Sequence, residues 1–297
     1  MTIKYIPETK EELKALIEQD VPGDQIDVRH ITDMSRLFKN SPYNHPLDSW
    51  DVSHVQFMAY MFYGSRYNHP LRSWNVSNVK DMDGMFYRSR YNHPLDSWDV
   101  SQVQCMTCMF EGSQYNYPLD SWDVSQVESM INMFYESQYN HPLGSWDVSR
   151  VKSMKYMFYG SQYNHPLGSW DVSQVESMCG MFMRSQYNHP LGSWDTSNVQ
   201  SMNSMFYGSK YNHPLGGDAK GVDSYDEGSL DADSYDASSW DTRRVRSMDS
   251  MFEGSQYTHY HSLLKWDTRS LKVINNIFNG TKIKILIDIK ILGFEVE

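Results

Sequence analysis

The chain has 297 residues, with 37 acidic and 26 basic side chains, and a formal net charge of −11. This acidic balance argues against nucleic acid as a partner, because phosphate binding requires clustered Lys and Arg. No apolar run reaches the roughly 18 residues of a membrane-spanning helix, so no membrane span is expected. Three cysteines are too few for a disulfide framework.

The first expected element is a helical N-terminal cap within residues 1–25. Thr9 and Glu12 form a capping box, and Leu13 and Ile17 lie on one face of the helix that follows. A terminal cap of this kind covers the open core of a repeat array. No basic-then-apolar leader precedes it, which predicts a cytoplasmic protein. The alternative is export to the cell surface by an unconventional route.

Residues 26–217 form regular repeats of 24 residues, and each repeat is called a coil below. Tryptophan marks this spacing, at Trp50, Trp74, Trp98, Trp122, Trp146, Trp170 and Trp194. Residues 240–281 form two further repeats, around Trp240 and Trp266. A period between 20 and 50 residues is typical of a solenoid, in which each coil contacts only its neighbours.

Two patterns follow one another within a coil. Trp50 and Val52 alternate with polar neighbours, which predicts a short parallel strand with both side chains buried. From Ser53 the apolar residues of 55–62 take helical spacing, which predicts a short helix with Ser53 as N-cap and Gly64 as a left-handed C-cap. Glycine recurs at this last position in every second coil, which indicates that the array grew by copying two-coil blocks.

The motif Leu47-x-x-Trp50-x-Val52-x-x-Val55-x-x-Met58-x-x-Met61-Phe62-x-x-Ser65 resembles the leucine-rich-repeat variant of BspA-like surface proteins. Its core, SWDVSxVxxMxxMF, resembles the DUF285 repeat of that family more closely, over residues 25–280. The resemblance implies an α/β repeat solenoid with right-handed, leucine-rich-repeat-like coils. It also implies protein binding or adhesion, and it carries no catalytic residues.

The rhythm fails in residues 218–239, an acidic degenerate coil or loop in which Asp218 stands at the expected Trp position. Its carboxylates include Asp223, Asp226, Asp233 and Asp236. They are interpreted as a solvated loop, with binding of calcium or of a basic partner as the alternative. The spacing lacks the EF-hand ligand series.

The C-terminal segment, residues 282–297, alternates Ile with polar residues and predicts a strand that caps the last coil. An uncovered strand edge pairs readily with another chain. The expected state is therefore a monomer or an end-to-end dimer through this strand.

Stacking turns the repeated polar residues into columns. The acidic column comprises Asp51, Asp99, Asp123, Asp147, Asp171 and Asp195. Each carboxylate either accepts hydrogen bonds from the following turn or belongs to a strip that binds a basic protein or cations, and both roles are compatible. The histidine column, His69 among its members, is interpreted as a copied Asn-His-Pro turn, with metal binding or pH sensing as the alternative.

These patterns favour a non-catalytic protein-binding scaffold without cofactor or metal. An adhesin exported without a classical signal is the second hypothesis, and carbohydrate binding through exposed tyrosines such as Tyr67 is the third. Cys105 and Cys108 form a C-x-x-C, interpreted as ordinary variation because no second pair or His follows at zinc-ligand spacing. No once-only Ser/His/Asp or Cys/His arrangement points to an enzyme.

Overall fold

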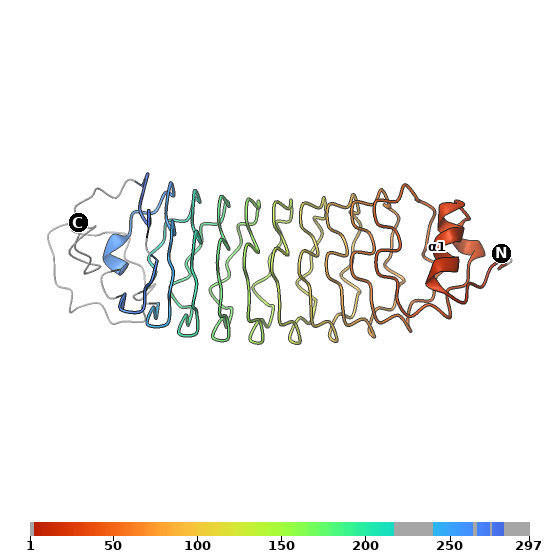
Figure 1. Ribbon diagram of the computed structural model, residues 1–297, viewed down its shortest axis with the longest axis horizontal. Coiled ribbons are helices and arrows are strands. Elements are labelled where there is room, and N and C mark those ends of the chain that lie inside the picture. The colour runs from red at the N-terminus through yellow and green to blue at the C-terminus, as the bar shows by residue number, and fades with distance from the viewer. Residues whose placement is uncertain (1–2, 217–239, 264–265, 274, 282–297) are drawn as a thin grey trace.

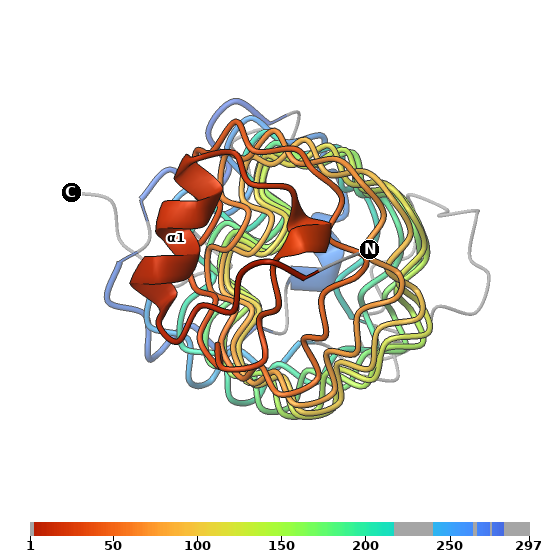
Figure 2. The same cartoon turned by 90° about the vertical axis from the view of Figure 1, so that its right-hand side faces the viewer.

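The computed structural model describes residues 3–216, 240–263, 266–273 and 275–281. These residues form an elongated stack of coils, with the N-terminal cap at one end (Figure 1). Seen end-on, the coils nearly superimpose around a common axis, and the cap lies across the first of them (Figure 2).

The expected α/β repeat with a strand and a helix in every coil is wrong. The named elements of the described residues are the helix α1 (Lys10–Glu18) and the 3-10 helices η1 (Gly23–Gln25) and η3 (Tyr260–Leu263). No sheet forms among them. Parallel pairing is confined to isolated bridges between neighbouring coils, such as Phe57 with Asp81 and Cys105 with Ser129. Apart from the bridge of Tyr5 with Ile26, each bridge lies at the position of Phe57 and not at that of Trp50, so the strand was also expected at the wrong place.

Hydrogen bonding explains why residues 55–64 are not helical. The backbone N–H groups of Met58 and Phe62 donate to the carbonyls of Asp81 and Met85 in the next coil, at 3.0 and 2.8 Å. Donors used between coils cannot serve the i→i−4 bonds of a helix. The remaining donors close tight turns, as Met61 does onto the Met58 carbonyl at 3.1 Å. The apolar spacing therefore reflects turns and not a helix.

Two residues per coil adopt the left-handed backbone conformation that ends such turns. Tyr60 has a φ of 56° and Gly64 a φ of 59°. Gly64 is thus left-handed as expected, but it caps no helix.

The side chain of one coil lies over the left-handed position of the next. A Cβ built on Gly180 falls 2.2 Å from the ring of Tyr156, and one built on Gly112 falls 3.2 Å from Cγ of Arg88. At these two positions glycine therefore leaves room for the large side chain of the preceding coil, a steric reason that adds to the copying of two-coil blocks inferred from the sequence.

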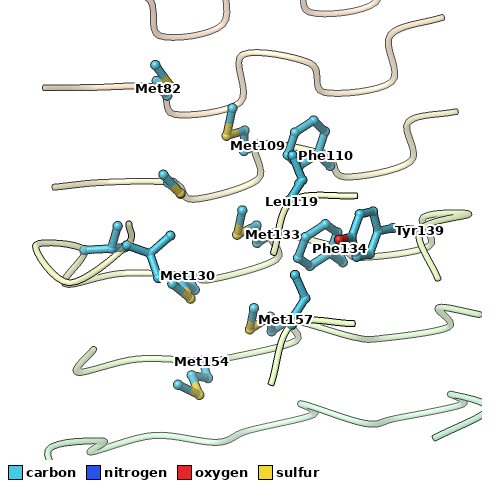
Figure 3. Packing of buried hydrophobic residues seen from close by; sticks show 14 of the residues in the cluster. Met82, Met109, Phe110, Leu119, Met130, Met133, Phe134, Tyr139, Met154 and Met157 are labelled. Atoms are coloured by element: carbon cyan, nitrogen blue, oxygen red, sulfur yellow. The ribbon is translucent and has the colours of Figure 1, made fainter. Parts of the chain in front are cut away.

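The core is a set of parallel side-chain columns. Met130, Met133 and Phe134 are fully buried, and the Phe110 and Phe134 rings stack at 5.8 Å (Figure 3). The tryptophans are buried as expected, with 3% exposure at Trp146. The indole of Trp146 also joins two coils, since its Nε1 donates to the Leu119 carbonyl at 2.9 Å. The core thus runs along the whole stack.

The helical N-terminal cap is confirmed. Thr9 accepts a hydrogen bond from the Glu12 N–H at its N-cap, and Glu12 accepts one from the Glu8 N–H. Leu13 and Ile17 are buried against the first coil and extend the core. The helix therefore closes the end of the stack that lies nearest the N-terminus.

Candidate functional site

The acidic column forms an exposed row with one position per coil, here called the acidic strip. Its carboxylates are Asp51, Asp99, Asp123, Asp147, Asp171 and Asp195. In each, Oδ1 accepts the backbone N–H of the serine two residues on, at 3.0 Å from Ser53 to Asp51 and from Ser149 to Asp147. The local turn role is confirmed. The expectation that Ser53 caps a helix is wrong, because no helix follows it.

The aspartates of the column differ in whether a cation pairs with them, and this separates the central coils from the two ends. In the central coils the residue two positions on is Ser, and hydrogen bonding to the side chains of Ser53 and Ser149 lowers the pKa of Asp51 and Asp147. At the ends the same position is Arg. Arg243 pairs with Asp241 at 2.6 Å, and Arg29 and Arg269 pair likewise with their aspartates. Among the described coils, the negative charge of the column is thus left open in the central ones.

The histidines connect neighbouring coils. Nε2 of His69 lies 2.7 Å from the Asn44 carbonyl, and the Asn68 N–H donates to Oδ1 of Asn44 at 3.0 Å. A carbonyl only accepts, so Nε2 must carry the proton. This geometry supports the turn interpretation. Within the described ranges, no group of three or more His, Cys, Asp or Glu is placed to hold a metal ion.

The tyrosine column that includes Tyr67 is buried, so the expected exposure of these residues is wrong. The Tyr67 ring lies 4.9 Å from Phe62 and 6.5 Å from Tyr91, and its side chain is inaccessible to solvent. A sugar cannot reach it. Carbohydrate binding through this column is therefore excluded on steric grounds.

The two cysteines of the C-x-x-C are free thiols. Burial, reinforced by Glu111, raises the pKa of Cys108 to about 12, and burial likewise raises the pKa of Cys105. A thiol of raised pKa is a poor nucleophile at neutral pH. The geometry agrees with ordinary variation at these positions.

Differences between coils concentrate on one segment, residues 54–64 and their equivalents, here called the varied face. The position of Ala59 carries a different residue in each of the regular coils, namely Ala59, Asp83, Thr107, Ile131, Lys155, Cys179 and Asn203. These side chains are at least partly accessible, whereas the intervening Met and Phe residues are buried. The buried residues are thus the same from coil to coil, whereas the exposed residues of the varied face differ.

The varied face carries half-exposed tyrosines that the sequence interpretation did not single out. Tyr63 and Tyr87 stack at 4.7 Å, and Tyr135 and Tyr159 stack at 4.3 Å. A column-by-column comparison of the coils would have drawn attention to them, since they occupy a position that also holds Glu111.

Several expected sites lie outside the described residues. They are Asp223, Asp226, Asp233 and Asp236 of the acidic segment and the C-terminal segment 282–297 with its dimer edge. Across the part of the chain that the structure describes, no helix combines the length and the hydropathy required to cross a bilayer.

Comparison with known proteins gives one finding. Residues 8–117, 111–217 and 226–289 each match the sequence model of a single family, described as "Mycoplasma protein of unknown function, DUF285". No curated protein and no solved structure matches the chain.

Proposed function

We propose, from the premise that this chain belongs to the DUF285 family, that it is a non-catalytic protein-binding scaffold whose acidic strip engages a basic protein. The observation that carries the proposal is the open negative charge of the central coils. Six exposed carboxylates recur there at the coil spacing, whereas the aspartates of the end coils are neutralised by Arg.

The carboxylates can serve the fold and a partner together. The turn uses Oδ1 of Asp147, at 3.0 Å from the Ser149 N–H. Oδ2 of the same group carries the delocalised charge toward solvent. A row of such groups at the spacing of stacked backbones, roughly 5 Å, complements a partner with several Lys or Arg residues. Repetition also raises the effective concentration of each contact once the first has formed.

The chain offers its own precedent for removing charge without breaking the turn. Asn75 stands in the acidic column, and its Oδ1 accepts the Ser77 N–H at 3.1 Å. An Asp→Asn change is therefore expected to keep the turn and to remove only the charge. This separates the structural role of the column from its binding role.

Binding of the full chain to poly-L-lysine tests the proposal. The variant Asp123→Asn/Asp147→Asn is expected to weaken binding about tenfold, equivalent to about 1.4 kcal/mol. The matched control Glu136→Gln/Glu176→Gln removes the same charge from the varied face and should change binding less than about twofold, or about 0.4 kcal/mol. Equal losses in both variants would show that only the net charge matters, and no loss in either would remove the strip from consideration.

A further inference from the structure

A second surface, on the varied face near the N-terminal cap, combines aromatic rings with unpaired cations. It is called the aromatic–basic patch and comprises Arg36, Lys39, Tyr60, Tyr63, Tyr87 and Arg88. Beside it lies Phe57, one of the few large apolar side chains that is well exposed, at 43%. The patch spans the first three coils.

Each ring of the patch lies close to one cation. Nζ of Lys39 lies 4.9 Å from the centre of the Tyr63 ring, which stacks on Tyr87 at 4.7 Å. Cζ of Arg88 lies 5.3 Å from the Tyr87 ring, and Cζ of Arg36 lies 5.7 Å from the Tyr60 ring. Because each ring of the stacked pair is approached by a cation and by the other ring, its faces are less open to a ligand than its edges.

This arrangement disfavours sugars and nucleic-acid bases, which both need an open ring face for stacking. Base stacking on aromatic platforms is the usual source of affinity for single strands. The net charge of −11 also opposes a polyanion as long as a nucleic acid. Ring edges and cations instead suit short anionic and apolar groups. An acidic peptide carries both kinds of group.

The local charge has the opposite sign to that of the whole chain. Six exposed cations lie in this region, namely Arg36, Lys39, Arg66, Lys80, Arg88 and Arg90. None of them takes part in an ion pair with another described residue. These cations are therefore available to an incoming carboxylate.

The carboxylates nearest to these cations are otherwise engaged. Asp33 pairs with Lys10 at 2.9 Å. Oδ1 of Asp83 accepts the Thr107 N–H at 3.0 Å, and burial raises the pKa of the Asp83 carboxyl. Glu111, which lies beside Tyr87, is buried and accepts a hydrogen bond from Nδ2 of Asn132 at 3.0 Å. These engagements reduce the competition of the three carboxylates with a ligand for the cations of the patch.

A groove extends the patch toward the cap. It encloses about 450 Å³ between α1 and the first coil, and Ile17 and Leu37 line it together with Lys14, Arg36 and Lys39. Two of these residues, Arg36 and Lys39, also belong to the patch. Glu18 also lines the groove, and it is paired with Lys14 at 3.7 Å. The groove thus offers an apolar floor, with the cations of Arg36 and Lys39 on its rim beside the stacked tyrosines.

We propose that the aromatic–basic patch docks an extended acidic peptide segment of a protein partner, with an apolar side chain of that segment in the groove beside α1. This extends the proposed scaffold function, on which it rests, to a second surface and to a partner of opposite charge. Arg and Tyr are enriched at the residues that dominate binding energy in protein interfaces.

The chain contains a matched comparison 96 residues further on. Tyr156, Tyr159 and Arg184 repeat Tyr60, Tyr63 and Arg88 at that interval. There the setting differs, because Met183 replaces Tyr87 and Ser153 replaces Phe57. The neighbouring Lys152 is already paired with Glu128, at 2.6 Å. This second set of residues lacks both the exposed phenylalanine and the excess of free cations.

Fluorescence anisotropy of labelled poly-L-glutamate with the full chain tests the proposal. The variant Lys39→Gln/Arg88→Gln is expected to weaken binding about tenfold, and Lys155→Gln/Arg184→Gln less than about twofold. Tyr63→Ala is likewise expected to weaken binding more than Tyr159→Ala does. Equal losses in the two double variants would reduce the effect to general charge attraction and overturn the proposal.

Two further measurements separate the alternatives. Binding of poly-L-lysine should be unchanged in Lys39→Gln/Arg88→Gln, so loss of poly-L-glutamate binding alone assigns the effect to the patch and leaves the acidic strip intact. A single-stranded oligonucleotide that binds more tightly than poly-L-glutamate, and that is lost in the same variant, would overturn the proposal in favour of nucleic acid. If the parent chain binds poly-L-lysine but not poly-L-glutamate, the proposed role of the patch is refuted and the scaffold proposal stands.

Discussion

Gly180→Ser tests whether the Tyr156 ring requires glycine at the equivalent position of the next coil. The backbone at Gly180 is left-handed, with a φ of 60°, and a Cβ there would lie 2.2 Å from the ring of Tyr156. In the following coil, Ser204 adopts the same conformation with a φ of 53°. Serine is thus compatible with the backbone, and the ring of Tyr156 is the obstacle.

Three effects set the expected cost. A left-handed non-glycine residue costs about 1–2 kcal/mol, and the lower chain entropy of the unfolded state returns about 0.4–1 kcal/mol. Displacing a packed ring adds about 1–3 kcal/mol. We expect Gly180→Ser to lower the free energy of unfolding by about 2–4 kcal/mol, but by only about 1 kcal/mol when Tyr156 is already Ala.

Equilibrium urea unfolding followed by tryptophan fluorescence measures this double-mutant cycle. Gly254→Ala is the backbone control, because its φ is 64° and nothing lies within 4 Å of a Cβ built there. The reasoning is refuted if Gly180→Ser costs the same with and without the Tyr156 ring. It also fails if Gly254→Ala is as costly as Gly180→Ser.

Three further predictions concern the core and the acidic strip. Trp146→Ala should lower the free energy of unfolding by about 3–5 kcal/mol, because a buried ring and its 2.9 Å hydrogen bond to Leu119 are lost; an unchanged midpoint in urea would place the indole outside the core. Tyr139→Phe should change it by less than about 1 kcal/mol or raise it, since the buried hydroxyl makes no hydrogen bond of ordinary geometry and only a weak interaction with the Leu119 backbone; a loss above 2 kcal/mol would contradict this. Asp51 and Asp147 have pKa values below the ordinary 3.8, so their stabilisation is complete above that pH and is lost as pH falls through the folded pKa. Thermal unfolding from about pH 5 downward should therefore show a steeper fall for the parent chain than for Asp147→Asn, and parallel curves would refute the assignment.

The periodic columns were predictable because burial follows a simple repeated pattern. Residues equivalent to Trp146 and Met130 recur at a fixed interval. In a stack of coils, an apolar side chain therefore packs against the equivalent side chains of the neighbouring coils. The turn role of Asp147 was equally local, since its partner Ser149 lies two residues away. The Thr9 cap was readable for the same reason.

The secondary structure within a coil was not predictable from spacing. The apolar interval between Val55 and Phe62 fits a helix and also fits a chain of turns, and the pattern carries no information on where the N–H groups donate. The choice depended on the Asp81 and Met85 carbonyls of the next coil, which satisfy the donors of Met58 and Phe62. The same reasoning explains the misplaced strand.

Exposure was the second quantity that sequence alone assigned wrongly. Tyr63 and Tyr67 are the same amino acid and lie four residues apart. Tyr67 is nevertheless buried beside Phe62, whereas Tyr63 stacks on the surface with Tyr87. Only the path of the backbone through its left-handed turns decides which of the two rings faces the core.

The sequence by itself determined the family, the coil length, the buried tryptophans and the N-terminal cap, because each rests on local or strictly repeated contacts. The tertiary structure alone decided that the backbone N–H groups donate to the neighbouring coil and do not form helices within each coil. It also decided that Lys39, Tyr63 and Tyr87, which come from three different coils, meet on one surface. Contacts between residues 24 apart have no signature within a single repeat, so they become visible only when the coils are stacked.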